Sequence, residues 1–365
     1  PLIPYLKNKN ERESFLNYYS PSKRMEKTKY FSYKTGELCG GCRMCVKGEK
    51  LVLFITGVCP RSCYFCPLSD EKYHKDVMYA NERKISNVDE LIEEAKISGA
   101  RGCGITGGDP LVCIEKTCKA IKRLKQNFKN FHIHLYTSLN LIDEKKIKKL
   151  EDAGLDEIRF HLDFDDESLW ERIKINTSMS KGIEVPVIPG KNLNKMINFV
   201  KEYVDFINLN ELEYADTEHN KLGDMKFETI NPLSYAIKGS EEIALEAMEK
   251  NSKLNIHYCT AKLKNTVQFM NRITRRAKNV KKPYDIQKGP SLFRGTISGE
   301  EDLKIMHEKV SKLFVNDIDP LKKRLLCSRQ NAKIFSKKLK KMGYKVEIVE
   351  ELGTYDQFEI ESQEL

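Results

Sequence analysis

Residues 57–67 have the sequence GVCPRSCYFCP and hold three cysteines, Cys59, Cys63 and Cys66, at C-x3-C-x2-C spacing. They directly follow an apolar run, residues 51–56, whose length and composition predict a buried strand. Three thiolates on a tight loop at the end of a strand can bind three irons of an iron–sulfur cluster. The fourth iron is then left without a protein ligand, so it can bind a substrate or cofactor as well as carry electrons.

The composition is that of a soluble, basic protein with a sizeable core. The chain has 365 residues, of which 40% are hydrophobic and 32% charged, and a net charge of +10. Much of the basic excess is lysine, so the charge alone argues only weakly for an anionic partner. No apolar run approaches the roughly 18 residues of a membrane helix, and residues 1–5 show no signal-peptide pattern. We therefore expect a cytoplasmic protein without a membrane partner, where thiols stay reduced.

A second cysteine triad, Cys39, Cys42 and Cys45, precedes the first at C-x2-C-x2-C spacing. Glycines between the first two cysteines allow tight turns that bring sulfurs together. The spacing alone fits a structural zinc knuckle as well as a second iron–sulfur cluster, and the neighbouring triad favours the cluster over zinc. Cys259 is the candidate fourth ligand, although an ordinary buried cysteine is as good an interpretation.

Apolar strands and amphipathic helices alternate along the chain from residue 51. The expected strands are 51–56, 102–106, 131–137, 157–162, 183–188 and 204–209. Helical patterns lie between them, including one over 167–178, and an irregular segment, 211–240, follows. This order predicts an α/β fold, a partial or full parallel (β/α)6 barrel, whose working residues sit at the C-terminal ends of the strands.

The remaining segments form the two ends of the predicted architecture. Residues 1–49 are expected to be an N-terminal cysteine-rich extension, with weak helical patterning around 11–19, and residues 50–285 the barrel with a basic helix at 260–279. From 290 to 365 strands and helices alternate differently, which predicts a small C-terminal α+β domain.

The first triad and its preceding strand resemble the radical S-adenosylmethionine (SAM) superfamily, and Phe65 just before Cys66 also fits. The next strand ends in Thr106-Gly107-Gly108-Asp109-Pro110, which resembles that family's second motif, usually Gly-Gly-Glu-Pro. The resemblance implies that Gly107, Gly108 and Asp109 contact the amino group of SAM. Aspartate is one methylene shorter than glutamate, so the contact could instead run through backbone carbonyls or water.

Other family positions carry over at later strand ends. The resemblance implies cofactor contacts for Ser138, for Arg159 and His161, and for Ile188 beside the adenine. A polar residue that merely ends a strand is an equally good interpretation of each. His132 and His134 alternate along one strand face, which favours ordinary half-buried histidines over a metal site.

The whole chain also resembles an archaeal group of radical SAM proteins related to pyruvate formate-lyase activating enzyme. The resemblance implies a 4Fe–4S cluster that binds SAM and, with one electron from a donor such as ferredoxin or flavodoxin, yields a 5′-deoxyadenosyl radical. That radical abstracts hydrogen from an unactivated carbon of the substrate.

Two basic segments bear on the identity of that substrate. Residues 261–290 carry nine Lys/Arg and one acid, and residues 321–345 carry ten and no acid. They make RNA modification, most simply of tRNA, the first hypothesis, against the alternative that both are solvated lysine-rich faces. The alternatives are an activase or maturase that modifies a protein or peptide, and a small-molecule enzyme of a cofactor pathway.

Overall fold

The computed structural model describes residues 25–365, so the helical patterning expected around 11–19 lies outside the described residues. The larger sheet has the strand order β1-β2-β11-β10-β9-β8-β7-β6-β3-β4-β5. Its strands are β1 Met25–Lys27, β2 Tyr33–Thr35, β3 Lys50–Phe54, β4 Met78–Ala80, β5 Arg83–Ile85, β6 Gly102–Thr106, β7 His132–Ser138, β8 Glu157–His161, β9 Ser180–Val187, β10 Phe206–Glu211 and β11 Ile256–Cys259.

The centre of this sheet is the predicted parallel barrel, and it is partial. The six predicted strands, β3 and β6 to β10, pair in parallel in chain order, and β11 adds a seventh beside β10. In the described chain the sheet stays open, because β3 pairs on its outer side with antiparallel β4 and β11 with antiparallel β2.

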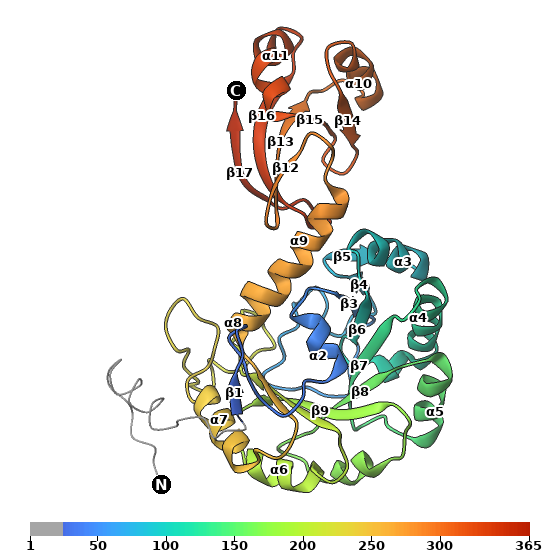
Figure 1. The fold of residues 1–365 in the computed structure, drawn as a ribbon, viewed down its shortest axis with the longest axis vertical. Helices are drawn as coiled ribbons and strands as arrows, with labels where there is room; N and C mark the ends of the chain where they lie inside the picture. The colour runs from blue at the N-terminus through green and yellow to red at the C-terminus, as the bar shows by residue number, and fades with distance from the viewer. Residues whose placement is uncertain (1–24) are drawn as a thin grey trace.

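Helices cover the outer face of the sheet (Figure 1). They are α3 Val88–Ile97, α4 Ile114–Asn127, α5 Glu144–Ala153, α6 Leu193–Val200 and α7 Ser240–Lys250. The helix expected over 167–178 is wrong in type and length, because only Trp170–Lys174 forms a 3₁₀ turn. A further short helix, α2 Gly40–Cys45, lies within the ring and contacts β3, β6 and β7.

The two faces of the parallel strands differ in character, as the alternation of side chains along a strand requires. In β7, Ile133 and Leu135 belong to the main hydrophobic core with the outer helices. His134 and Tyr136 face the other way, and their side chains hydrogen-bond to each other at 2.9 Å. The barrel interior is therefore polar, and it holds α2.

A second, antiparallel sheet follows in the order β14-β15-β13-β16-β17, with β12 paired to β13. Its elements are β12 Ile286–Lys288, β13 Ser291–Ser298, α10 Leu303–Ser311, β14 Asn316–Asp319, β15 Arg324–Cys327, α11 Arg329–Lys341, β16 Lys345–Leu352 and β17 Glu359–Glu364. The sheet lies to one side of the barrel (Figure 1). The sequence did not predict β14, and the boundaries proposed at 50–285 and 290–365 stay predictions.

The basic helix predicted at 260–279 joins the two sheets (Figure 1). It consists of α8 Ala261–Leu263, a π-helical turn over Lys264–Gln268 and α9 Phe269–Val280. The Arg276 guanidinium on α9 is buried and donates to Glu94 of α3 at 2.9 Å and to the Gly353 carbonyl at 2.9 Å. Arg276 therefore ties the C-terminal sheet to the barrel. In residues 25–365, no helix has the length and apolar character needed to cross a membrane.

Candidate active site

The loop that carries Cys59, Cys63 and Cys66 follows β3 at the C-terminal edge of the parallel sheet. It closes on itself, because the Gly57 amide donates to the Lys75 carbonyl at 2.8 Å and its carbonyl accepts from the His74 amide at 3.1 Å. A Cβ atom on Gly57 would lie 1.6 Å from the Lys72 carbonyl oxygen, so only glycine fits there. The loop is thus anchored at the strand end, as predicted.

The three thiols of this loop are half-buried and free. Burial raises the pKa of all three, that of Cys63 to about 11, so a bound metal is needed to hold them as thiolates near neutral pH. The Arg61 amide lies 3.4 Å from the Cys59 sulfur and can donate to it. The donor set of three thiols with a nearby amide fits three corners of an iron–sulfur cluster.

The spacing of these thiols is not that of a single-ion site. Within residues 25–365, no three His, Cys, Asp or Glu side chains converge closely enough to hold one metal ion. A single zinc ion draws its ligands to one point, whereas a cluster attaches each thiolate to a different iron.

Three predicted cofactor residues gather around the cysteine loop. The Phe65 ring lies 5.9 Å from the His161 ring between centroids, and Phe65 packs in one apolar cluster with Ile188. The Nδ1–H group of His161 donates to the Glu184 carbonyl, 3.1 Å away. Burial, and then the charge of Arg61, lowers the pKa of His161 to about 4, so this imidazole is neutral at physiological pH.

Gly107 and Gly108 press against the start of the cysteine loop. The Gly108 amide donates to the Thr56 carbonyl at 2.7 Å. Added Cβ atoms would lie 2.3 Å from the Thr56 oxygen at Gly107 and 2.3 Å from the Val58 oxygen at Gly108. In this structure the space beside the glycines is occupied by the backbone of residues 56–58.

The carboxylate of Asp109 is fully buried and saturated with hydrogen bonds. It accepts from the Leu111 amide at 3.0 Å, the Thr137 hydroxyl at 2.8 Å, and the Ser138 amide and hydroxyl at 3.0 and 2.7 Å. Four donors fill the lone-pair sites of a carboxylate. The Asp109 carboxylate therefore ties residues 109–111 to β7, and its contact with the amino group of SAM stays a prediction.

Arg159 lies with the other triad, away from the position expected for a SAM contact. Its side chain is 2% exposed. Its Nη2 atom lies 3.2 Å from the Cys39 sulfur and 3.8 Å from the Cys42 sulfur, while Nη1 donates to Glu184 at 2.6 Å and Nε to Glu157 at 2.6 Å.

The Cys39 triad lies inside the barrel because α2 inserts there. The Gly41 amide donates to the Glu157 carboxylate at 3.0 Å, and a Cβ atom on Gly41 would lie 2.3 Å from Arg159 Nη2. The glycine permits this close approach. A hydrogen bond with Cys42, and then burial, raises the pKa of Cys39, and burial raises that of Cys45 to about 11.

Several interior residues near this triad were not predicted as site residues. Glu157 and Glu184 both bind Arg159, and Asn208 lies 3.6 Å from the Cys42 sulfur. The signal was present in the alternation of polar and apolar residues in 157–161, because a strand covered by helices on its outer face can keep polar side chains only inside the barrel.

Cys259 and His257 lie on β11, the strand next to Asn208. The Cys259 sulfur accepts from Gln268 at 3.7 Å and packs with Val46 and Leu263. His257 is 3% exposed, and within the described chain neither of its ring nitrogens has a hydrogen-bond partner. Burial lowers the pKa of His257 to about 4.

The irregular segment 211–240 covers the cysteine loop. The Lys221 amide donates to the Tyr64 carbonyl at 2.7 Å, and Leu222 packs with Tyr64 and Phe65. The segment that the sequence predicted to be irregular therefore lies over the cysteine loop.

The three arginines of α9 are engaged within the protein. Arg272 binds Glu82 and Asn81, Arg275 donates to the Gly99 carbonyl at 2.6 Å, and Arg276 is the buried tie to Glu94. In the second basic segment, Arg324 binds Asp319 and Glu351. These arginines serve intramolecular contacts, which leaves the RNA hypothesis without support from them.

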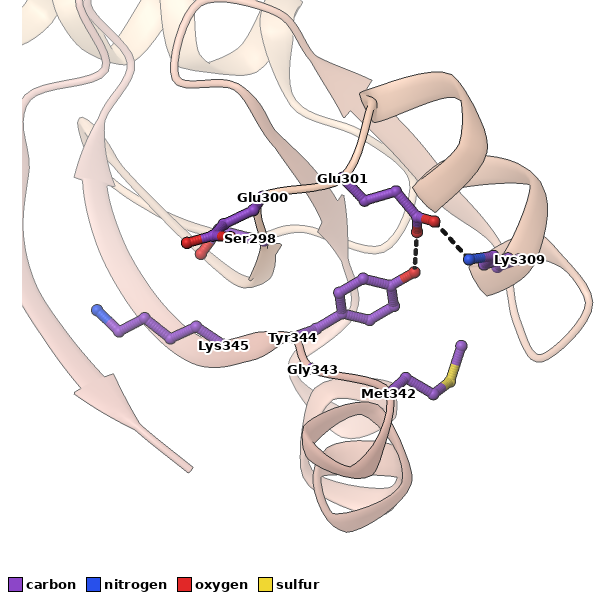
Figure 2. A pocket seen from close by; sticks show the side chains of 9 residues that line it. Ser298, Glu300, Glu301, Lys309, Met342, Gly343, Tyr344 and Lys345 are labelled. Carbon is purple, nitrogen blue, oxygen red and sulfur yellow. Dashed lines mark hydrogen bonds and ion pairs between the residues drawn. The ribbon is translucent and has the colours of Figure 1, made fainter.

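A pocket of the C-terminal sheet is a weaker candidate site (Figure 2). Its lining residues are Ser298, Gly299, Glu300, Glu301, Lys309, Met342, Gly343, Tyr344 and Lys345. Glu301 is occupied by the Tyr344 hydroxyl at 2.6 Å and Lys309 at 2.5 Å. The pocket contains none of the cysteines.

Comparison with known proteins shows a family whose matched range includes the Cys59 triad. A sequence profile of the radical SAM superfamily matches residues 53–185. A protein of Methanocaldococcus jannaschii, provisionally named a glycyl-radical enzyme activating enzyme, is 42% identical over 299 residues, covering 77% of this chain and 79% of that protein. A protein of Methanococcus maripaludis, provisionally named a GTP 3′,8-cyclase, is 30% identical over 156 residues, covering 40% of this chain and 48% of that protein.

Solved structures are more distant. The radical SAM methyltransferase TsrM from Kitasatospora setae, with cobalamin and a 4Fe–4S cluster bound, aligns at a TM-score of 0.39 and 10% identity. The alignment covers 68% of this chain and 56% of that one.

Proposed function

Since the chain belongs to the radical SAM superfamily, we propose that it is an activating enzyme that generates a radical on a partner protein. The observation that carries this proposal is the 42% identity, over 77% of the chain, to a protein provisionally named a glycyl-radical enzyme activating enzyme. The protein-modifying alternative considered from the sequence therefore replaces tRNA modification as the main hypothesis.

The residues of the first triad have a defined part in this chemistry. Cys59, Cys63 and Cys66 hold a 4Fe–4S cluster and leave one iron for SAM. Bound there, such a cluster would supply the one-electron reduction of SAM, with the electron coming from a ferredoxin-type or flavodoxin-type donor. Cleavage of one C–S bond would then give methionine and a 5′-deoxyadenosyl radical. That radical takes a hydrogen atom from the partner, which leaves 5′-deoxyadenosine and a carbon radical. The protein orients the reactants and excludes water.

The neighbouring residues are proposed to shape the SAM site in two ways. Phe65, His161 and Ile188, which lie close to the cysteine loop, line the cofactor's nucleoside side. Gly107, Gly108 and Ser138 fix the loop against β6 and β7 through Asp109, and backbone carbonyls there receive the ammonium group of SAM. Arg159 has no part in this site.

The surface near the cysteine loop supports a protein partner. The covering segment 211–240 exposes large apolar side chains, with Leu233 97% and Tyr235 58% exposed. Exposed apolar side chains beside a reaction site are typical of protein-binding surfaces. In contrast, the arginines of α9 that motivated the RNA hypothesis bind the chain itself.

The decisive experiment supplies a partner protein. The full chain, reconstituted anaerobically with iron, sulfide, SAM and a reductant, is mixed with a glycyl-radical enzyme from the same genome. Activation should give a protein radical by electron paramagnetic resonance (EPR) and 5′-deoxyadenosine in matching amount. Cys63→Ala is the control that should give neither. SAM cleavage without a protein radical, together with a modified nucleoside in co-incubated tRNA, would reject the activase proposal and restore the RNA hypothesis.

A further inference from the structure

We propose that the barrel interior holds a second iron–sulfur cluster whose ligands are Cys39, Cys42, Cys45 and His257. The inference rests on the proposed function only in assuming iron–sulfur chemistry, and it holds for any substrate. It replaces Cys259, the fourth ligand expected from the sequence, by a histidine on the same strand.

The Cys39, Cys42 and Cys45 triad is placed inside the barrel by α2. The helix α2 lies inside the barrel against β3, β6 and β7, and of the three cysteines Cys42 is buried while Cys39 and Cys45 are partly buried. Cys39 and Cys42 both receive the guanidinium of Arg159, and Asn208 lies within 3.8 Å of both sulfurs. Donors directed at ligand sulfurs stabilise thiolates and tune the potential of a cluster.

The buried imidazole of His257 has no hydrogen-bond partner among the described residues. A buried polar group without a partner is rare in native proteins and needs an explanation. His257 is directly opposite Asn208 in the parallel pairing of β10 and β11, so the two side chains point to the same face of the sheet. Asn208 contacts Cys39 and Cys42 on that face. Coordination of the imidazole to iron would give a partner to one of the two ring nitrogens that have none among the described residues.

Two other side chains, Cys259 and His134, are less suited than His257 to be the fourth ligand. The Cys259 sulfur already has a donor in Gln268 and apolar neighbours in Val46 and Leu263. His134 also has an unpartnered nitrogen, Nδ1, but a Cβ atom on Gly41 would lie 2.7 Å from it, so the helix backbone crowds that nitrogen. The Nε2 atom of His134 is paired with Tyr136.

The test uses the full chain with Cys59, Cys63 and Cys66 replaced by alanine, so that only the second cluster can form. Iron and acid-labile sulfide per chain, the EPR spectrum of the reduced protein and its midpoint potential are measured. This parent should contain about four irons and four sulfides per chain. Because it cannot cleave SAM by design, the result is independent of the proposed function.

Three further variants in this background identify the fourth ligand. His257→Ala should lose most of its iron or change its EPR spectrum. His257→Cys should retain the cluster at a lower potential, because histidine ligation raises the potential relative to cysteine. Cys259→Ala and His134→Gln, the matched controls, should resemble the parent. Circular dichroism checks that each variant is folded.

Three outcomes would overturn the inference. A His257→Ala variant with the iron content, spectrum and potential of the parent would exclude His257 as a ligand. Loss of the cluster in Cys259→Ala, with His257→Ala intact, would assign the fourth position to Cys259. One zinc per chain and no iron in the parent would make the site a zinc site.

Discussion

The two cysteine triads have similar spacing and opposite surroundings. Cys59, Cys63 and Cys66 lie on a loop at the C-terminal edge of the sheet and are half-buried, and the Cys59 sulfur accepts from the Arg61 amide. Cys39 and Cys42 lie within the barrel beside the buried guanidinium of Arg159. The spacing of the cysteines therefore distinguishes the two sites less than the burial of their thiols and the side chains around them do. One site must admit SAM, and the other is enclosed by the fold.

Removing one thiol from each triad should give the largest difference between the two sites. Cys63→Ala should reduce 5′-deoxyadenosine formation to background, because the cluster that reduces SAM loses one of its three ligands. Cys45→Ala, the matched change in the other triad, should still cleave SAM in the absence of partner. Chromatographic quantification of 5′-deoxyadenosine with dithionite as reductant checks both. Equal loss in the two variants would mean that the triads do not act separately.

Two arginines allow the same comparison for stability. Arg159→Met should lower the free energy of unfolding by about 3–5 kcal/mol, because it leaves the buried carboxylates Glu157 and Glu184 without their cation. Arg61→Met, in the exposed loop, removes a partly exposed pair with Asp163 and should cost about 1 kcal/mol or less. Urea unfolding of the metal-free proteins measures both, and a larger loss for Arg61→Met would contradict the contrast.

Substitution of two glycines, one beside each triad, compares how tightly the two regions are packed. Gly108→Ala should destabilise the protein by about 1–3 kcal/mol, because the new methyl group meets the backbone oxygen of Val58, which cannot move aside. Gly41→Ala meets the side-chain ends of Arg159, His134 and Glu157 rather than backbone atoms and should cost less, since alanine also favours the helix by about 1 kcal/mol. The melting temperatures rank the two, and the reverse ranking would show that the interior is the stiffer region.

A pH dependence is the smallest expected effect. The pKa of His161 is lowered by burial to about 4 from 6.5. Between these values the unfolded chain binds a proton that the folded chain does not, so stability falls as the pH falls from about 6.5 to 4. His161→Gln should reduce this acid-induced loss by about 1–2 kcal/mol, as the partly exposed ring is screened by solvent. Urea midpoints at pH 7 and pH 4.5 measure the difference, and an unchanged slope would refute it.

Local patterns were enough to predict the exposed site. The strand before Cys59, the cysteine loop after it and Gly107-Gly108 at the next strand end lie in neighbouring parallel strands, as their chain order implies. Asp109 shows the limit of such reasoning, because its partners Thr137 and Ser138 come from another strand. From the residue type alone one predicts a carboxylate near a ligand. Only the fold shows that this carboxylate already accepts hydrogen bonds from Thr137 and Ser138.

The interior site could not be predicted to the same extent. Arg159 and His161 point to the same face of β8, but they are two residues apart, a difference in depth of about 6.6 Å. That difference puts His161 beside the cysteine loop and Arg159 beside Cys39. The sequence did not reveal that α2 enters the barrel, because its contacts join residues distant in the chain. Similarly, β14 lacks the apolar alternation that announces a strand.

The insertion of α2 has a consequence for the biogenesis of the protein. The Gly41 amide binds a residue 116 positions later, and Cys39 contacts one 169 positions later. During synthesis α2 leaves the ribosome long before the strands that enclose it, and it must wait for them to dock. Any metal centre at these cysteines therefore reaches its final surroundings only after β8 and β10, which carry these partners, have been synthesised.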